Sequence, residues 1–363
     1  MVIRFFMPLA SRVSCRARLI MPRLIIASVA VALGCDTPDL QHQLVGAAES
    51  ARPVLARAAQ YSQWSPAVRL ESAGAPADPA FNTSSLDGCP LMSRDGKSFY
   101  MASTRPGGLG GIDIWVSTRS SEDEPWGAPV NVVAPINSAA NDFCPTIDRD
   151  GRRFFFVSER ATWAGGAACG GADIYVTRFR SDGTAEEPEN LGCNWNGGPN
   201  SAANEASPSP LPESGKGPVL YFSSSRAGGF TQEAVGAVAG DQDIYMSRSH
   251  GGVYGPAELV AGVNSAYEDA QPNVKRDALE IFFFSTRPGT LGGPDIYAAT
   301  RARTSDPWST PVNLGANVNS TAGDSRPSIS WDGTVLHFGS TRSGGEGMSD
   351  IYMTTRQKLN GSN

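Results

Sequence analysis

The 363-residue chain has little charge, few histidines and no long hydrophobic run. Only 18% of its residues are charged, and 40 glycines and 26 prolines interrupt it, which excludes a coiled coil or a protein of long helices. A net charge of −6 provides no overall basic field, so a nucleic-acid partner is not expected. The three histidines, His42, His250 and His337, are scattered, which argues against a zinc site, and no cofactor is predicted.

What the sequence does contain points to a folded protein of short strands. Hydrophobic residues make up 40% of the chain and aromatic residues 9%, which excludes wholesale disorder. The length is sufficient for two ordinary domains or one large all-β domain. The abundance of turn-forming residues favours the all-β class.

The first 34 residues resemble an export signal. They carry five arginines and no acidic residue, followed by a ten-residue apolar run at 24–33. Such a run is too short to span a membrane comfortably, and a small residue follows it, as in a secretory signal. Cys35 directly after Gly34 resembles the lipid-attachment cysteine of a bacterial lipoprotein signal. Export with ordinary cleavage and an uncleaved anchor remain the alternatives.

The remaining boundaries follow from composition. Without residues 1–34 the chain has 25 basic and 36 acidic residues, a net charge of −11. Residues 35–62 are rich in alanine and polar residues and are predicted to be a flexible tether. Residues 63–357 form the predicted folded domain, and residues 358–363 a disordered tail.

The folded region consists of five copies of one repeat. Each copy begins with Asn followed by Ser or Thr, then an acid five residues after the Asn, then a proline three residues after the acid. The five acids are Asp87, Asp142, Glu205, Asp269 and Asp324. A turn, an apolar run ending in Ser-x-Arg, a glycine-rich loop and an Asp-Ile-aromatic triplet follow in every copy.

This pattern predicts four short strands per repeat and five repeats in a ring. Runs such as 154–157 and 281–284 are apolar on both faces, so these strands must be covered on both sides, as in blades around an axis. The last repeat lacks a fourth strand, whereas an additional one at 64–70 precedes the first repeat. We therefore expect an all-β, five-bladed β-propeller in which the N-terminal strand completes the last blade.

The repeated Pro, Asp-Gly, Phe-x-Ser-x-Arg, Gly-Gly and Asp-Ile-Tyr elements resemble the WD40-like repeat of TolB-type β-propeller proteins of the bacterial envelope. The resemblance covers residues 64–356. It implies a periplasmic or surface binding scaffold more readily than an enzyme. The chain has no separate N-terminal α/β domain of the TolB kind, so the partners of TolB itself are not transferred.

Two sets of acids invite functional interpretations. The five acids named above precede the innermost strands and are predicted at the mouth of the central channel, where they could bind a cation or a basic side chain. Alternatively, each accepts hydrogen bonds from its own turn or pairs with a neighbouring arginine. The arginine of each Ser-x-Arg element is predicted to close the loop that follows by bonding to the Asp of Asp-Ile-aromatic.

Four cysteines lie in the folded region, which is an even number suited to disulfides in an oxidising compartment. Cys169 and Cys193 are predicted on the same face of the ring and are the favoured pair. Cys89 and Cys144 occupy equivalent positions in adjacent repeats, near the axis, but equivalence does not guarantee a bondable geometry. His337 replaces an aromatic residue of the other repeats and is predicted to be packed in the core.

The departures from the repeat suggest a binding surface. Longer loops fall at 71–81, 161–172, 192–199 and 227–242, all predicted on one face, with Trp163, Trp195 and Phe230 as candidate anchors. We therefore predict an exported, lipid-anchored, monomeric scaffold that binds an envelope protein or polysaccharide without catalysis. The alternative is a glycan-active enzyme with carboxylates at the propeller axis.

Overall fold

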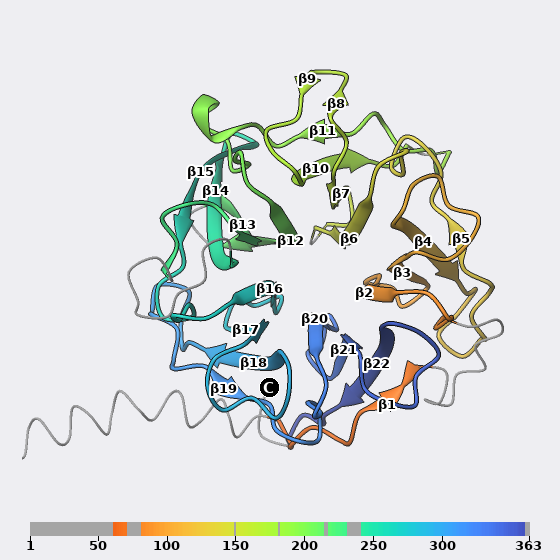
Figure 1. Ribbon diagram of the computed structural model, residues 1–363, viewed down its shortest axis with the longest axis vertical. Coiled ribbons are helices and arrows are strands. Elements are labelled where there is room, and N and C mark those ends of the chain that lie inside the picture. The colour runs from red at the N-terminus through yellow and green to blue at the C-terminus, as the bar shows by residue number, and fades with distance from the viewer. Residues whose placement is uncertain are drawn as a thin grey trace, which may run out of the picture. The chain divides into compact units, whose positions relative to one another are not determined.

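Five four-stranded sheets stand around a central axis as the blades of a β-propeller (Figure 1). The computed structural model describes residues 61–70, 81–148, 150–180, 182–213, 217–230 and 241–359. The predicted signal, Cys35 and nearly all of the predicted tether lie outside these residues. Within them, no helix is both long and apolar enough to cross a membrane.

The strands of each blade are given from the axis outward. Blade 1 has β2 (Asp87–Met92), β3 (Ser98–Ser103), β4 (Asp113–Thr118) and β5 (Val130–Asn131). Blade 2 has β6 (Asp142–Ile147), β7 (Arg153–Ser158), β10 (Asp173–Arg178) and β11 (Glu189–Asn190). Blade 3 has β12 (Glu205–Glu213), β13 (Gly217–Ser224), β14 (Asp243–His250) and β15 (Val253–Leu259). Blade 4 has β16 (Asp269–Val274), β17 (Glu280–Ser285), β18 (Asp295–Thr300) and β19 (Val312–Asn313). Blade 5 has β20 (Asp324–Ile329), β21 (Val335–Ser340), β22 (Asp350–Thr355) and β1 (Val68–Arg69).

The N-terminal strand closes the ring, as the repeat count predicts. β1 pairs antiparallel with β22, with Val68 opposite Met353. Upstream of β1, the Trp64 ring lies beneath the guanidinium of Arg356, whose Cζ is 4.4 Å from the ring centroid. Tyr61 forms a bridge with Lys358, so the ordered ring extends slightly beyond the predicted limits of 63 and 357. The two ends of the domain are thereby joined in one blade.

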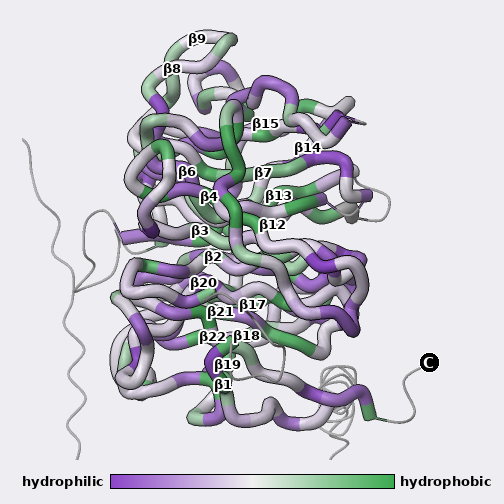
Figure 2. Tube along the Cα trace, turned by 90° about the vertical axis from the view of Figure 1, so that its right-hand side faces the viewer, coloured by the Kyte–Doolittle hydropathy of each residue, from purple (hydrophilic) through white to green (hydrophobic). Residues whose placement is uncertain are grey.

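The hydrophobic core lies between adjacent blades. One cluster joins Tyr221 of blade 3 to Phe283 of blade 4, and another joins Phe282 of blade 4 to Phe338 of blade 5. β17 is buried along its whole length because blades 3 and 5 cover its two sides. In the side view of Figure 2, many of the strongly hydrophobic segments lie between the two faces of the ring. This packing explains why the second strands are apolar on both faces.

Every innermost strand contains a β-bulge just before its proline. The residue at this position has a left-handed backbone in all five blades, with φ between 46° and 56°. The five residues are Cys89, Cys144, Ser207, Gln271 and Arg326. Left-handed backbone is uncommon for residues other than glycine, so its recurrence marks a requirement of the repeat. The five residues also line the constriction at the axis.

His337 is packed in the core between blades 5 and 1, as predicted. Its side chain is 2% exposed, and its ring meets the edge of Phe99 at a centroid distance of 5.2 Å. Burial lowers the pKa of His337 from 6.5 to about 4. The imidazole is therefore neutral in the folded protein at neutral pH.

Replacing His337 should make the free energy of unfolding depend less on pH below pH 6.5. Between pH 6.5 and about 4 the unfolded chain binds a proton that the folded protein does not, so stability is complete above this window and falls as the pH drops through it. Over this pH window, we expect the free energy of unfolding of His337→Phe to fall by up to ~3 kcal/mol less than that of the unmodified protein. Denaturant unfolding at neutral and acidic pH would measure it, with exposed His250→Gln as control. An unchanged slope in His337→Phe would contradict the assignment.

Candidate functional site

A buried carboxylate opens each innermost strand and is held by three or four donors. In blade 1, Asp87 accepts hydrogen bonds from the Thr83 backbone N–H at 2.7 Å and its hydroxyl at 2.8 Å. The Ser103 hydroxyl donates at 2.5 Å and Arg105 Nη2 at 2.7 Å. The side chains of Asp87, Asp142, Glu205, Asp269 and Asp324 are all fully buried. We call this arrangement the clasp.

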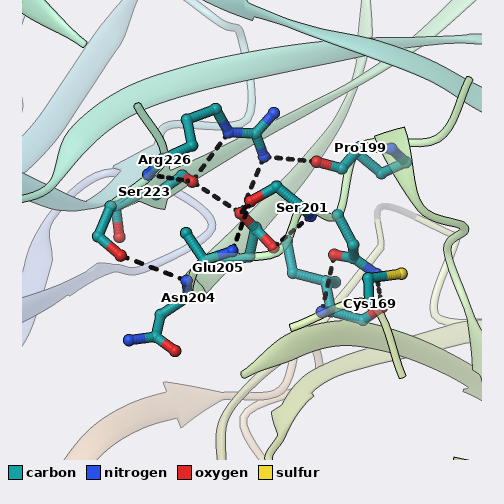
Figure 3. A network of polar contacts seen from close by, with 12 residues as sticks. Cys169, Pro199, Ser201, Asn204, Glu205, Ser223 and Arg226 are labelled. Carbon is teal, nitrogen blue, oxygen red and sulfur yellow. Dashed lines mark hydrogen bonds and ion pairs between the residues drawn. The ribbon is translucent and has the colours of Figure 1, made fainter. Parts of the chain in front are cut away.

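Figure 3 shows the clasp of blade 3, where glutamate replaces aspartate. Ser201 donates to Glu205 through its backbone N–H at 2.7 Å and its hydroxyl at 2.6 Å. Arg226 Nη2 bonds to Glu205 at 2.9 Å and to the carbonyl of Pro199 at 2.5 Å. The arginine thus links the carboxylate to the connection from the preceding blade.

The arginine of each Ser-x-Arg element bonds to a different acid from the predicted one. β2 pairs with β3 so that Asp87 lies opposite Ser103, which places Arg105 next to Asp87. Asp113, the predicted partner, instead accepts the backbone N–H groups of Leu109 and Gly110. The glycine-rich loop is therefore closed by its own backbone, and the prediction of an Arg–Asp bond across it was wrong.

The five acids also do not present an open ring to the central channel. All five side chains are 0% exposed, and each carboxylate is bound by the arginine of its own blade. The hydrogen-bonded alternative thus describes them, and a cation would have to displace an arginine. Within the described residues, no three His, Cys, Asp or Glu side chains are grouped to hold a metal ion.

The asparagine of each repeat joins adjacent blades. Asn137 accepts from the Ile114 backbone N–H at 2.9 Å and donates to its carbonyl at 2.8 Å. Asn82 makes the same pair of bonds to Ile351 of blade 5, at 2.6 and 3.1 Å. The side-chain amide thus pairs with the third strand of the preceding blade as the backbone of a neighbouring strand would. The contact of Asn82 with Ile351 makes this link between the first and last blades.

Removing one clasp arginine should destabilise the fold. Arg105→Met leaves the buried carboxylate of Asp87 without its charged partner, and we expect the free energy of unfolding to fall by about 3 kcal/mol. Exposed Arg303→Met is the matched control and should change stability by less than about 0.5 kcal/mol. Chemical denaturation measures both. Equal stability of the two variants would show that the clasp is not a stabilising unit.

The axis is closed near the middle of the ring. Cys89 and Cys144 form a disulfide between blades 1 and 2, the pairing whose geometry the sequence left open. Gln271 and Arg326 line the same constriction, where the cavity measures about 30 Å³. Burial lowers the pKa of Arg326. The channel therefore does not run open from face to face.

The loop face carries the long connections, and the structure places the three predicted anchors there on different segments. This face holds the connections from the second to the third strand of each blade and those between blades, which meet at bridges such as Ala172 with Asn204. Trp195 is 61% exposed in the 3₁₀ turn η2 (Asn194–Asn196), and Phe230 is 49% exposed. Trp163, in the hairpin of β8 (Thr162–Trp163) and β9 (Gly166–Ala167), is partly buried against the core between blades 1 and 2.

The second disulfide stiffens the loop face. Cys169 and Cys193 are bonded, with Cα atoms 5.3 Å apart, as favoured from the sequence. The backbone N–H of Cys169 also donates to Asp173 at 2.6 Å. Burial raises the pKa of Asp173. The disulfide thus joins the β7–β10 loop to the β11–β12 loop that carries Trp195.

The opposite face, which holds the turns between first and second strands, contains a cavity that the sequence patterns did not predict. We call this face the hairpin face and the cavity the funnel; it measures about 460 Å³ and is lined by all five innermost strands. A groove of about 400 Å³ shares Arg94, Arg276 and Trp331 with it and continues to Arg153 and Tyr254. One feature of the sequence could have indicated this cavity. The second position of the turn between the first and second strands holds a large side chain in four blades: Arg94, Arg149, Arg276 and Trp331.

Two carboxyl groups in one turn at the funnel, those of Asp148 and Asp150, have pKa values shifted in opposite directions. Asp148 accepts from Arg153 Nε at 2.7 Å and occupies the position of Ser93 and Ser330 in blades 1 and 5. Burial, followed by a hydrogen bond with Asp150, raises the pKa of Asp148. The same hydrogen bond lowers the pKa of Asp150. Asp148 therefore favours its protonated form relative to its neighbour.

Comparison with solved structures identifies the same fold at low identity. A glycoside hydrolase covers 86% of this chain and 96% of its own, with 12% identity and a TM-score of 0.52. A thermostable family-43 glycoside hydrolase covers 79% and 93%, with 13% identity and a TM-score of 0.49. A putative TolB from Agrobacterium tumefaciens covers 76% and 91%, with 15% identity and a TM-score of 0.42. No protein-family model and no curated protein matches the chain. These likenesses show the fold alone.

Proposed function

We propose that this protein is an exported, lipid-anchored and monomeric scaffold that binds an envelope protein or polymer through its loop face, without catalysis. The observation that carries the proposal is the engagement of all five axial carboxylates in clasps, with each side chain fully buried. Groups held in this way are not available as a catalytic acid or base. The two disulfides agree with an oxidising compartment.

The loop face supports binding through its exposed aromatic side chains. Trp195 lies two residues after Cys193, which the disulfide fixes in place. The backbone N–H of Phe230 donates a hydrogen bond to Asp243 at 2.8 Å. Both side chains therefore project from anchored segments, which reduces the entropy lost when a partner orders them. Aromatic side chains of this kind dominate the binding energy of many interfaces.

A glycan-active enzyme is the second candidate, and one observation favours it. Asp148 and Asp150 have pKa values displaced in opposite directions, and both lie at the cavities of the hairpin face. A glycosidase needs two carboxyl groups in such distinct protonation states. Against this, Asp148 accepts the Arg153 side chain and the backbone N–H groups of its own turn, which is a structural task.

The loop face can be tested by affinity capture from envelope extract. We expect the double variant Trp195→Ala, Phe230→Ala to retain less than about a tenth of the material that the unmodified protein captures, because truncating two anchors costs several kcal/mol. Val253→Ala, which truncates an exposed side chain at the start of β15, is the control. Undiminished capture would contradict the loop-face assignment. Release of sugars that Asp148→Asn abolishes would favour the enzyme.

Lipid anchoring can be tested at Cys35. We expect the full chain to partition with the membrane fraction and to take up radiolabelled palmitate when expressed in a bacterium. Cys35→Ser should lose the label and move to the soluble fraction, because lipid attachment requires the thiol. Cys15→Ser, which alters another cysteine of the N-terminal region, is the control. Equal labelling of the two variants would contradict an anchor at Cys35.

A further inference from the structure

The funnel on the hairpin face contains arginines that have no acidic partner. Within the described part of the chain, no carboxylate forms an ion pair with Arg94 or Arg276. The clasp arginines differ, since each of them bonds to a buried acid. Unpaired guanidinium groups gathered at one cavity are typical of a site that takes an anionic ligand.

Both arginines are held in place by an aromatic ring. The guanidinium Cζ of Arg94 is 5.2 Å from the centroid of Trp331, and that of Arg276 is 5.5 Å from it. Trp331 belongs to blade 5, between Arg94 of blade 1 and Arg276 of blade 4. A cation–π contact orients a guanidinium without consuming its N–H donors. Both arginines can therefore still donate to a ligand in the funnel.

The acids at the same cavity are already engaged. Asp95 accepts from the Ser93 hydroxyl at 2.6 Å and from the Lys97 backbone N–H at 3.2 Å. Asp148 bonds to Arg153 at 2.7 Å. The lining thus holds two arginines and two aspartates. It offers free guanidinium N–H donors rather than an excess of positive charge, because the aspartate oxygens are engaged and no hydrogen bond from Arg94 or Arg276 is formed within the described residues.

The wall of the funnel also carries neutral polar groups that have no partner. The hydroxyls of Thr146 and Ser328 make no hydrogen bond within the described residues. The side-chain carbonyl of Asn273 accepts from the Ile329 backbone at 3.0 Å, but its amide N–H groups have no partner there. These groups lie on innermost strands, between the arginines at the mouth and the constriction. They match a ligand that has hydroxyl groups between its charges.

We propose that the funnel binds an acidic sugar: a hydroxylated carbon chain or ring with two carboxylates. The carboxylates bond to Arg94 and Arg276 at the mouth, and the hydroxyls bond to Thr146, Asn273 and Ser328. The cavity of about 460 Å³ lies within the usual range for small-molecule sites. This site is on the face opposite the long loops, so it does not depend on the proposed loop-face partner.

Three six-carbon probes separate the components of the proposal. Glucarate has two carboxylates and four hydroxyls, sorbitol replaces the carboxylates with alcohols, and adipate retains the carboxylates but has no hydroxyls. Titration calorimetry of the full chain at low salt should show saturable binding of glucarate, with sorbitol at least about tenfold weaker. Adipate should bind more weakly than glucarate, because it cannot bond to the polar wall. This comparison uses the unmodified protein and does not depend on the folding of any variant.

A set of variants then assigns the site. Arg94→Met with Arg276→Met should weaken glucarate binding at least about tenfold, whereas Arg303→Met should leave it unchanged. Saturable glucarate binding that survives the double change would overturn the site, as would the absence of binding up to ~10 mM. Equal affinity for glucarate and sorbitol would overturn the anionic class, and equal affinity for glucarate and adipate would overturn the sugar. Capture through Trp195 and Phe230 is unaffected by any of these results.

Discussion

The clasp is the interaction on which the ring depends. A carboxylate fully removed from water is costly unless its oxygens are hydrogen-bonded and its charge is paired, and each of the five receives an arginine and several N–H or O–H donors. The donors come from the connection before the strand and from the end of the second strand. One carboxylate therefore fixes the inner edge of a blade against its neighbour. The adjacent asparagine completes the junction by bonding to the third strand of the preceding blade.

Because the repeated residues serve to join the blades, a ligand can be recognised only by residues outside the repeat. The residues that join blades are nearly the same in every copy and are taken up by the clasps, so they do not distinguish one ligand from another. The disulfide between Cys89 and Cys144 and the side chain of Arg326 narrow the axis to a cavity of about 30 Å³. Recognition is consequently confined to the two faces. Long loops with exposed aromatic residues vary on one face, and the second turn position varies on the other.

The fold could be predicted because the repeat is a property of spacing. Five equally spaced Asn–acid–Pro elements indicated five blades, and the unmatched strand before the first of them indicated closure, which the pairing of β1 with β22 confirms. The pairing of polar groups could not be predicted in the same way. Arg105 is eight residues from Asp113 and eighteen from Asp87, yet it bonds to the more distant acid because β2 and β3 lie side by side.

The sequence by itself determined the number of blades, the closing strand, the packed environment of His337 and the face that carries the long loops, since these depend on periodicity and hydrophobicity along the chain. Only the tertiary structure decided which carboxylate each arginine meets, that Cys89 and Cys144 bond, that Trp163 is partly buried, and that Arg94, Arg276 and Trp331 share a cavity. The physical reason is that each of these contacts joins residues from different strands or blades. Their distance is set by the curvature of the ring, which no local pattern in the sequence records.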